Sequence, residues 1–243
     1  MGIYFLSDTH LSPNQPVVYD KFLRYLRSIR KDADELYILG DLFDYWIGDD
    51  GSALLGHNPA IEALAELSDG GVQVSVMHGN RDFLIGPEFI TEIGGTLIPD
   101  PTTIELNGQT VLLMHGDSLC TDDVEHQRYR EVVLSPEWQE SILEQPISER
   151  LNRALDMRAA SEKNKQVKSQ SLMDVNQQSV LQTMKQYGVR ILIHGHTHRP
   201  QVHHFEIDGC EATRYVLGDW GRNNDTVIVV NSEGTINLHH AEI

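Results

Sequence analysis

Residues 2–10 read GIYFLSDTH, a compact apolar run followed by a polar Asp-Thr-His turn. A similar apolar run and polar turn recur at four further places, which are Gly40-Asp41, Gly79-Asn80-Arg81-Asp82, His115-Gly116-Asp117 and His194-Gly195-His196-Thr197-His198. Between the first runs, apolar residues recur at helical spacing over residues 19–29 and 60–67. Strands that alternate with helices predict an α/β sheet, and ligands bind at the carboxyl edge of such a sheet. All five turns are therefore expected at that edge.

The strand pattern becomes denser toward the end of the chain. The early strands are expected at residues 2–6, 36–39, 72–77 and 110–114. After residue 190, closely spaced β runs with turn residues between them are expected at residues 191–193, 202–207, 213–217, 226–230 and 236–239. These later runs predict a second sheet that packs on the first.

Residues 122–175 interrupt the strand pattern with a predicted helical insertion. Ser135-Pro136 and Gln145-Pro146 are typical helix starts, because proline fits the first helical turn. Two apolar stripes stand at helical spacing, formed by Leu134, Trp138 and Ile142 and by Ile147, Leu151 and Leu155. Six basic and two acidic residues lie between Arg150 and Lys168, a local net charge of +4. An ordinary helical insertion with a solvated charged face is one reading. The reversal of charge favours the other, a lid over something anionic and partly apolar.

Composition excludes several classes of protein. The chain has 243 residues, with 19 Lys and Arg against 36 Asp and Glu, and a net charge of −17. This acidic balance argues against general nucleic-acid binding, because basic surface grips phosphate backbones. Two cysteines, Cys120 and Cys210, exclude a disulfide framework. With no leader pattern and no apolar run near the roughly 18 residues of a membrane span, we expect a soluble intracellular protein.

The five turns supply a mixed set of oxygen and nitrogen donors. The set holds two carboxylates, one amide oxygen and four imidazoles, from Asp8, His10, Asp41, Asn80, His115, His196 and His198. Such donors suit borderline divalent ions, including manganese, iron and zinc, better than a structural zinc site. Each turn alone is more typical of a helix cap or an ordinary turn. Five of them in order, each after a predicted strand, indicate a metal centre.

The order Asp-x-His, Gly-Asp, Gly-Asn, His and Gly-His-x-His resembles the calcineurin-like metallophosphoesterases. The resemblance implies a four-layer α/β/β/α sandwich, formed by one domain over residues 1–243, with two divalent ions. It implies that Asp8, His10 and His198 hold one ion. Asn80, His115 and His196 would hold the other, and Asp41 would bridge the two. Paired metals about 3.5–4 Å apart lower the pKa of a bound water and stabilise charge in an in-line displacement.

Arg81 departs from the pattern of many superfamily members, which carry a histidine after Gly-Asn. That histidine protonates an alkoxide leaving group, whereas an arginine cannot donate a proton near neutral pH. Arginine can hold a phosphate with two hydrogen bonds. A phosphate leaving group, with a pKa near 6, departs without protonation. Arg81 therefore favours a pyrophosphate substrate, and a structural Arg81–Asp82 ion pair is the alternative.

Longer blocks are similar to those of the UDP-2,3-diacylglucosamine hydrolases, over nearly the whole chain. They span residues 40–43, 46–50, 79–84, 115–123, 173–176 and 194–200. The resemblance implies that water attacks the α-phosphorus of UDP-2,3-diacylglucosamine, giving UMP and 2,3-diacylglucosamine 1-phosphate in lipid A biosynthesis. It implies manganese as the metal.

The same resemblance assigns roles to individual residues. The catalytic group comprises Asp8, His10, Asp41, Asn80, Arg81 and His115. Substrate contacts are expected from Asn80, Arg81, Asp123, Ser161, Lys168 and His196, and from Lys165 or Asn164 where the family has an asparagine. The apolar stripes of the insertion would line a trough for two acyl chains. The neighbouring basic residues would meet the substrate phosphates or the anionic membrane surface. We expect peripheral attachment to the cytoplasmic face of the bacterial inner membrane, with no obligate protein partner.

Two other functions fit the same residues in part. A soluble nucleotide pyrophosphatase or phosphodiesterase of the same superfamily would share the metal ligands, so the insertion must discriminate. A metal-dependent scaffold that binds partners through the insertion belongs to a different class. The completeness of the ligand set argues against the scaffold, which has no need for an open site with two metals.

Overall fold

The computed structural model describes residues 2–167, 173–221 and 224–241, and two sheets form its centre. The first sheet has the order β11-β10-β1-β2-β3-β4, and the second has the order β5-β6-β7-β9-β8. The strands of the first sheet are β1 (Gly2–Leu6), β2 (Ala33–Leu39), β3 (Gln73–Met77), β4 (Thr96–Ile98), β10 (Thr226–Val230) and β11 (Ile236–His240). Those of the second are β5 (Thr102–Leu106), β6 (Gln109–Met114), β7 (Ile191–His194), β8 (Gln201–Ile207) and β9 (Cys210–Val216).

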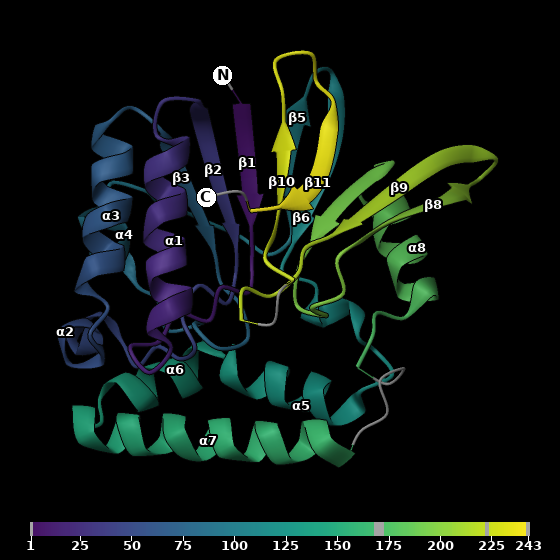
Figure 1. Ribbon diagram of the computed structural model, residues 1–243. Coiled ribbons are helices and arrows are strands. Elements are labelled where there is room, and N and C mark those ends of the chain that lie inside the picture. The colour runs from purple at the N-terminus through teal and green to yellow at the C-terminus, as the bar shows by residue number, and fades with distance from the viewer. Residues whose placement is uncertain (1, 168–172, 222–223, 242–243) are drawn as a thin grey trace.

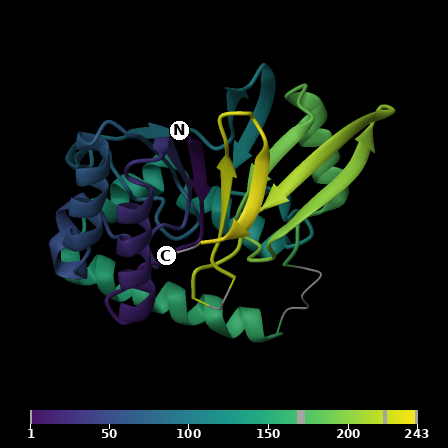
Figure 2. The ribbon, with the colours of Figure 1, turned by 45° about the horizontal axis from the view of Figure 1, so that its top comes forward.

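Helices cover the outer face of each sheet, as Figure 1 shows. The first sheet is covered by α1 (Pro16–Ile29), α3 (Asn58–Asp69) and α4 (Pro87–Glu92), and the second by α8 (Gln177–Gln186). The short α2 (Ser52–Leu55) precedes α3. The β8–β9 hairpin extends away from the first sheet (Figure 2). The expected four-layer α/β/β/α sandwich is confirmed.

Strand β2, which lies between these layers, is buried on both faces over its second half. On β2, Leu36 and Ile38 join the core beneath the helices, while Tyr37 and Leu39 join the core between the two sheets. Successive side chains of a strand point to opposite faces, so a strand buried on both sides is a continuous apolar run. This explains why residues 36–39 of β2 lack polar alternation.

The assignment of strands to sheets differs from the expectation in two respects. Only β7, β8 and β9 of the late runs lie in the second sheet; β10 and β11 extend the first sheet, where β10 pairs antiparallel with β1. In addition, β6 lies in the second sheet and not with the early strands. Local hydrophobicity identifies a strand but does not specify its neighbour. One edge of β1 pairs with β2, and β10 covers the other edge, which would otherwise expose unpaired backbone groups. The short strands β4 and β5 were not expected.

Three helices cross the ends of the strands (Figure 1). They are α5 (Val124–Val133), α6 (Pro136–Leu143) and α7 (Ile147–Val167). Both predicted starts are confirmed, since α6 begins at Pro136 and α7 begins directly after Pro146. The Ser135 side chain caps α6 by accepting a hydrogen bond from the Trp138 backbone N–H. In the described part of the chain, no helix is both long and apolar enough to cross a membrane.

The apolar stripes of these helices agree with the expectation except at one position. Ile142 is buried, and Leu134, Trp138, Ile147 and Leu151 pack against the core beneath the helices. Leu155, by contrast, is 46% exposed. On α7 the inward face continues instead through Ala154 and Met157. At 3.6 residues per turn, Leu155 lies eight positions after Ile147 and is rotated about 80° away from it.

Candidate active site

Backbone in the left-handed region marks the turns at the strand ends. Five non-glycine residues of these turns have positive φ angles: Asp8 (53°), His10 (45°), Asp41 (54°), His196 (65°) and His198 (57°). Positive φ is uncommon for residues other than glycine, and such conformations cluster at functional sites. All five were predicted from sequence as metal ligands, and the structure brings their turns together.

The first donor cluster consists of Asp8, His10 and His198. The Nε2 atoms of His10 and His198 lie 3.1 Å apart, and Asp8 Oδ1 is 3.3 Å from His198 Nε2. Asp8 is buried, and among the described residues Oδ1 has no hydrogen-bond donor. One donor atom from each residue fits within 4.8 Å of the others. A buried carboxylate oxygen and two converging imidazole nitrogens fit a divalent cation.

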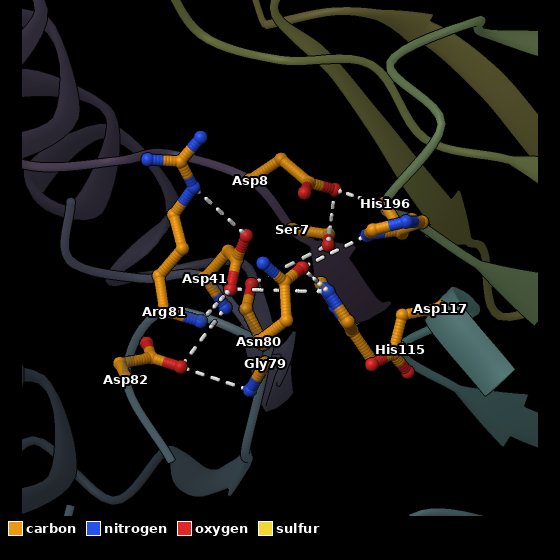
Figure 3. Close-up of polar contacts among 12 residues, drawn as sticks. Ser7, Asp8, Asp41, Gly79, Asn80, Arg81, Asp82, His115, Asp117 and His196 are labelled. Atoms are coloured by element: carbon orange, nitrogen blue, oxygen red, sulfur yellow. Dashed lines mark hydrogen bonds and ion pairs between the residues drawn. The ribbon is translucent and has the colours of Figure 1, made fainter. Parts of the chain in front are cut away.

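The second donor cluster forms around Asn80. Its Oδ1 atom is 3.1 Å from His115 Nε2 and 2.9 Å from His196 Nδ1 (Figure 3). Asp41 lies between the two clusters, with Oδ1 3.8 Å from His115 Nε2 and Oδ2 3.8 Å from His10 Nδ1. The seven predicted ligands therefore converge, and the arrangement supports a site for divalent metal.

Hydrogen bonds on the outer side orient two of the imidazoles. His115 Nδ1 lies 2.9 Å from the Leu39 carbonyl oxygen, so that it donates there and Nε2 faces Asn80 and Asp41. His198 Nδ1 lies 3.5 Å from Asp219 Oδ2. A carbonyl or carboxylate on the far nitrogen is the usual support of a metal-binding histidine, because it fixes the tautomer and the ring.

The ionisation of the site reflects burial and charge together. Burial raises the pKa of Asp41 to about 7, against the opposing effect of His115. Burial lowers the pKa of His115 and His198, but the neighbouring carboxylates prevail and raise each to about 9. Protons on these two imidazoles thus offset the buried carboxylates. A divalent cation carries the same positive charge and would replace those protons.

The Asp82 carboxylate holds two of the turns together. It accepts hydrogen bonds from four backbone N–H groups: Asp41 (3.2 Å), Leu42 (2.7 Å), Phe43 (3.3 Å) and Gly79 (2.8 Å). The turns approach so closely that a Cβ atom on Gly79 would lie 2.1 Å from Asp41 Oδ1, which explains the glycine. The alternative interpretation, an Arg81–Asp82 ion pair, is therefore wrong.

Arg81 pairs instead with two other carboxylates. Its Nη1 donates to Asp44 Oδ1 at 3.0 Å. Its Nε lies 3.5 Å from Asp41 Oδ2, as Figure 3 shows. Asp44 also accepts a hydrogen bond at 2.9 Å from Arg158 Nε of α7. The Arg81 side chain is 9% exposed, and its guanidinium group lies beside the donor clusters. The carboxylate of Asp44, which both arginines share, connects it to α7.

A large cavity of about 820 Å³ separates the donor clusters from the three crossing helices. Five of the predicted substrate contacts line it, namely Asn80, Arg81, Asp123, Ser161 and His196. Lys165 lies on α7, but its side chain is outside the described residues, as is Lys168 altogether. The structure therefore brings together the predicted contacts that it describes.

Two neighbours of the candidate metal ligands were missed by the sequence analysis. Asp219 supports His198, and it follows β9 in a Gly-Asp pair like that of Gly40-Asp41, so the same signal could have found it. His126 of α5 stacks on His196, with ring centroids 5.2 Å apart, and its Nε2 is 3.6 Å from Asp117 Oδ2. Nothing in the local sequence marks His126, because its position depends on how α5 crosses the site.

Comparison with known proteins is consistent with this geometry. The family model of calcineurin-like phosphoesterases matches residues 1–200. A UDP-2,3-diacylglucosamine hydrolase of Chromohalobacter salexigens is 49% identical over 220 residues, covering 90% of this chain and 89% of the relative. One from Edwardsiella ictaluri is 45% identical over 235 residues, covering 96% and 90%. A solved archaeal phosphodiesterase covers 98% of this chain and 99% of its own at 13% identity, with a TM-score of 0.50, and shows the fold alone.

Replacement of Asp82 by asparagine should weaken the site through its backbone. The amide keeps one oxygen, but its NH2 group faces N–H donors, so the free energy of unfolding should fall by about 1–3 kcal/mol. Because the ligand turns lose their support, manganese affinity should fall by about 10–100-fold. Urea denaturation and titration calorimetry measure the two effects.

Asp69→Asn, at an exposed position at the end of α3, is the matched control and should change neither quantity. Full manganese affinity in Asp82→Asn would show that the turns hold their geometry without this carboxylate.

Proposed function

Because the chain belongs to the calcineurin-like phosphoesterases and, within them, to the UDP-2,3-diacylglucosamine hydrolases, we propose that it hydrolyses the pyrophosphate bond of UDP-2,3-diacylglucosamine. Water attacks the α-phosphorus, and the products are UMP and 2,3-diacylglucosamine 1-phosphate, a step of lipid A biosynthesis. One observation carries the proposal: seven metal-type donors converge beside a cavity of about 820 Å³ that is lined by both apolar and basic side chains.

Two manganese ions are proposed for the donor clusters. Asp8, His10 and His198 would hold one, Asn80, His115 and His196 the other, with Asp41 in contact with both. Bound there, the ions would supply Lewis acidity and a water of lowered pKa. The protein keeps this region preorganised: the carbonyl of Leu39 and the carboxylates of Asp82 and Asp219 fix the ligands before substrate arrives.

Arg81 stabilises negative charge on the substrate phosphates. Its guanidinium lines the large cavity and lies next to Asp41, where a phosphate would meet the site. It holds charge and moves no proton, since a guanidinium stays protonated at any physiological pH. A departing sugar phosphate needs no proton either, because its pKa is near 6. The chemistry of this position thus matches an anhydride better than an alkyl ester.

The crossing helices suit the lipid half of the substrate. Trp138, Ile142, Ala154 and Met157 give the cavity apolar surface. Basic side chains from α7 also line it, namely Arg150, Arg153 and Arg158. An apolar wall with a few convergent charged groups is typical of a ligand site, and here it fits two acyl chains on a phosphorylated sugar. Residues 122–175 would then act as the substrate lid.

Peripheral attachment to the inner membrane is also proposed. Four exposed apolar side chains lie on the crossing helices, which are Val124 and Val132 on α5, Leu143 on α6 and Leu155 on α7. Apolar side chains beside basic residues favour insertion into the boundary of an anionic bilayer. The lipid could then pass from the bilayer into the cavity beneath these helices.

Product analysis in ¹⁸O-labelled water tests the reaction. With manganese, UDP-2,3-diacylglucosamine should give UMP that carries the label, because attack at the α-phosphorus places the new oxygen there. A chelator should abolish turnover, and metal analysis should find two manganese ions per chain. Label in the sugar phosphate, or full turnover after removal of all metal, would contradict the proposal.

UDP-glucose is the control substrate for the soluble alternative. It carries the same anhydride without acyl chains, so a lid for the lipid half predicts much slower turnover than with the diacylated substrate. Equal kcat/KM for the two would favour a soluble nucleotide pyrophosphatase.

Arg81→Ala should raise the activation free energy by about 2–4 kcal/mol, the range for single electrostatic stabilisers. Metal content should stay the same, because Arg81 is no ligand. Steady-state kinetics and metal analysis test both statements. Arg24→Ala, which removes an exposed arginine paired with Asp20 on α1, is the matched control. A variant that keeps its turnover and loses only thermal stability would assign Arg81 to ion pairing alone.

Sedimentation with vesicles of phosphatidylethanolamine and phosphatidylglycerol tests membrane attachment. At low salt the protein should sediment with them, and Leu143→Glu combined with Leu155→Glu should reduce the bound fraction several-fold, because each adds a charge to the apolar face. Tyr187→Glu, at an exposed position after α8, should have no such effect. If Tyr187→Glu reduced the vesicle-bound fraction as much as the Leu143→Glu and Leu155→Glu double variant, the membrane contact would lie elsewhere.

A further inference from the structure

A second, smaller cavity of about 310 Å³ adjoins the metal ligand Asn80. Among the described lining residues, it shares Asn80 and Tyr129 with the large cavity, and the others differ. Its walls come from residues 78–80 after β3, from residues 97–100 at the end of β4, from Asp117 and from α5. The volume is at the lower limit of small-molecule sites, which is about 300 Å³.

The charges of the small cavity differ from those of the large one. Five arginines and five carboxylates are among the described residues that line the large cavity, so its charges balance, whereas the small cavity has one arginine and two carboxylates. In the small cavity Arg130 lies between two carboxylates, donating from Nε to Asp117 Oδ2 at 3.0 Å and lying 3.5 Å from Asp100 Oδ2 through Nη2. An anion would be repelled by the two carboxylates, whereas a neutral group with both donors and acceptors would find partners for each.

Much of the remaining wall of the small cavity is apolar. Leu97, Ile98 and Pro99 form one stretch of it, and Leu134, directly after α5, forms another, while His78 adds a polar ring. Leu97 is 37% exposed, which is unusual for a leucine in a sheet and leaves apolar surface open beside the polar groups. Such a wall suits a flat ring.

The geometry of the reaction requires two compartments. In an in-line displacement at the α-phosphorus, the attacking and leaving oxygens lie on opposite sides of phosphorus. The sugar phosphate leaves, so it extends along this axis. The nucleoside stays bonded to the same phosphorus and projects to the side. It therefore needs space next to the metal ligands that is separate from the lipid cavity.

We infer that the small cavity binds the nucleoside of the substrate and of the UMP product. This inference rests on the proposed function. The uracil ring lies against Leu97 and Pro99, with Asp100 and Arg130 at its polar edge. Uracil presents one ring N–H between two carbonyl oxygens, which complements a carboxylate acceptor beside a guanidinium donor. Cytosine has an unprotonated nitrogen at that ring position, so the Asp100 carboxylate disfavours it.

Binding of UMP, CMP and ribose 5-phosphate to the manganese-loaded protein, measured by calorimetry, tests the inference without turnover. All three probes offer the same phosphate to the metals, so differences report the base. UMP should bind about tenfold or more tightly than ribose 5-phosphate, equivalent to about 1.4 kcal/mol. It should also bind more tightly than CMP. Equal affinities for UMP and ribose 5-phosphate would overturn the inference.

Two cavity-filling variants locate the base. Leu97→Trp fills the small cavity and should bring the affinity for UMP down to that for ribose 5-phosphate. Ala154→Trp fills the large cavity and should leave UMP binding unchanged while weakening binding of 2,3-diacylglucosamine 1-phosphate. The reverse pattern would place the base in the large cavity and overturn the inference.

Arg130→Gln is a third variant, which tests the inference if a new tryptophan disturbs folding, as thermal unfolding would reveal. It keeps hydrogen-bond donors but removes the charge, and should lower the preference for UMP over ribose 5-phosphate; an unchanged preference would contradict the assignment of Arg130. The proposed function is tested independently of this inference: it is wrong if the wild-type protein does not cleave UDP-2,3-diacylglucosamine. The preference for UMP is measured whether or not cleavage occurs.

Discussion

Four hydrogen bonds to the Asp82 carboxylate hold the turn after β2 against the turn after β3. Every other feature of the site depends on this contact, because it positions both Asp41 and Asn80. Asp41 is the residue with an oxygen near each donor cluster, and Asn80 is the centre of the second cluster. A buried carboxylate that satisfies backbone donors is also one of the few ways to bury such tight turns without leaving N–H groups unpaired.

The charge around the site is more balanced than the charge of the chain. A protein of net charge −17 is a poor binder of phosphates over most of its surface. Around the cavity, positive charge comes from arginines of α7 and from Arg81; with Arg199 they number five and balance the five carboxylates among the described lining residues. Asp44 connects these two sources of positive charge, since it accepts from Arg81 on one side and from Arg158 on the other. The helices and the metal ligands thus form one electrostatic unit.

Much of the fold and of the ligand set could be predicted from local sequence. Apolar runs locate β1, β2 and β3, and prolines locate the starts of α6 and α7, because these signals act within a few residues. The seven candidate ligands were predicted because each follows a predicted strand, and the structure brings them together. The pairing of β10 with β1 could not be predicted, since it depends on contacts between distant segments. For the same reason the partners of Arg81 and the stacking of His126 on His196 appear only in the folded chain.

The left-handed turns have a consequence for how such a centre can arise and change. Among residues with side chains, aspartate, asparagine and histidine tolerate positive φ angles far better than branched or bulky ones. The same side chains are the ones that coordinate divalent ions. Backbone geometry at these strand ends therefore filters random substitutions toward ligands and away from valine or isoleucine, whatever the metal contributes. A scaffold with this geometry acquires metal-binding side chains by drift more readily than a flat strand end does, and it loses them more slowly.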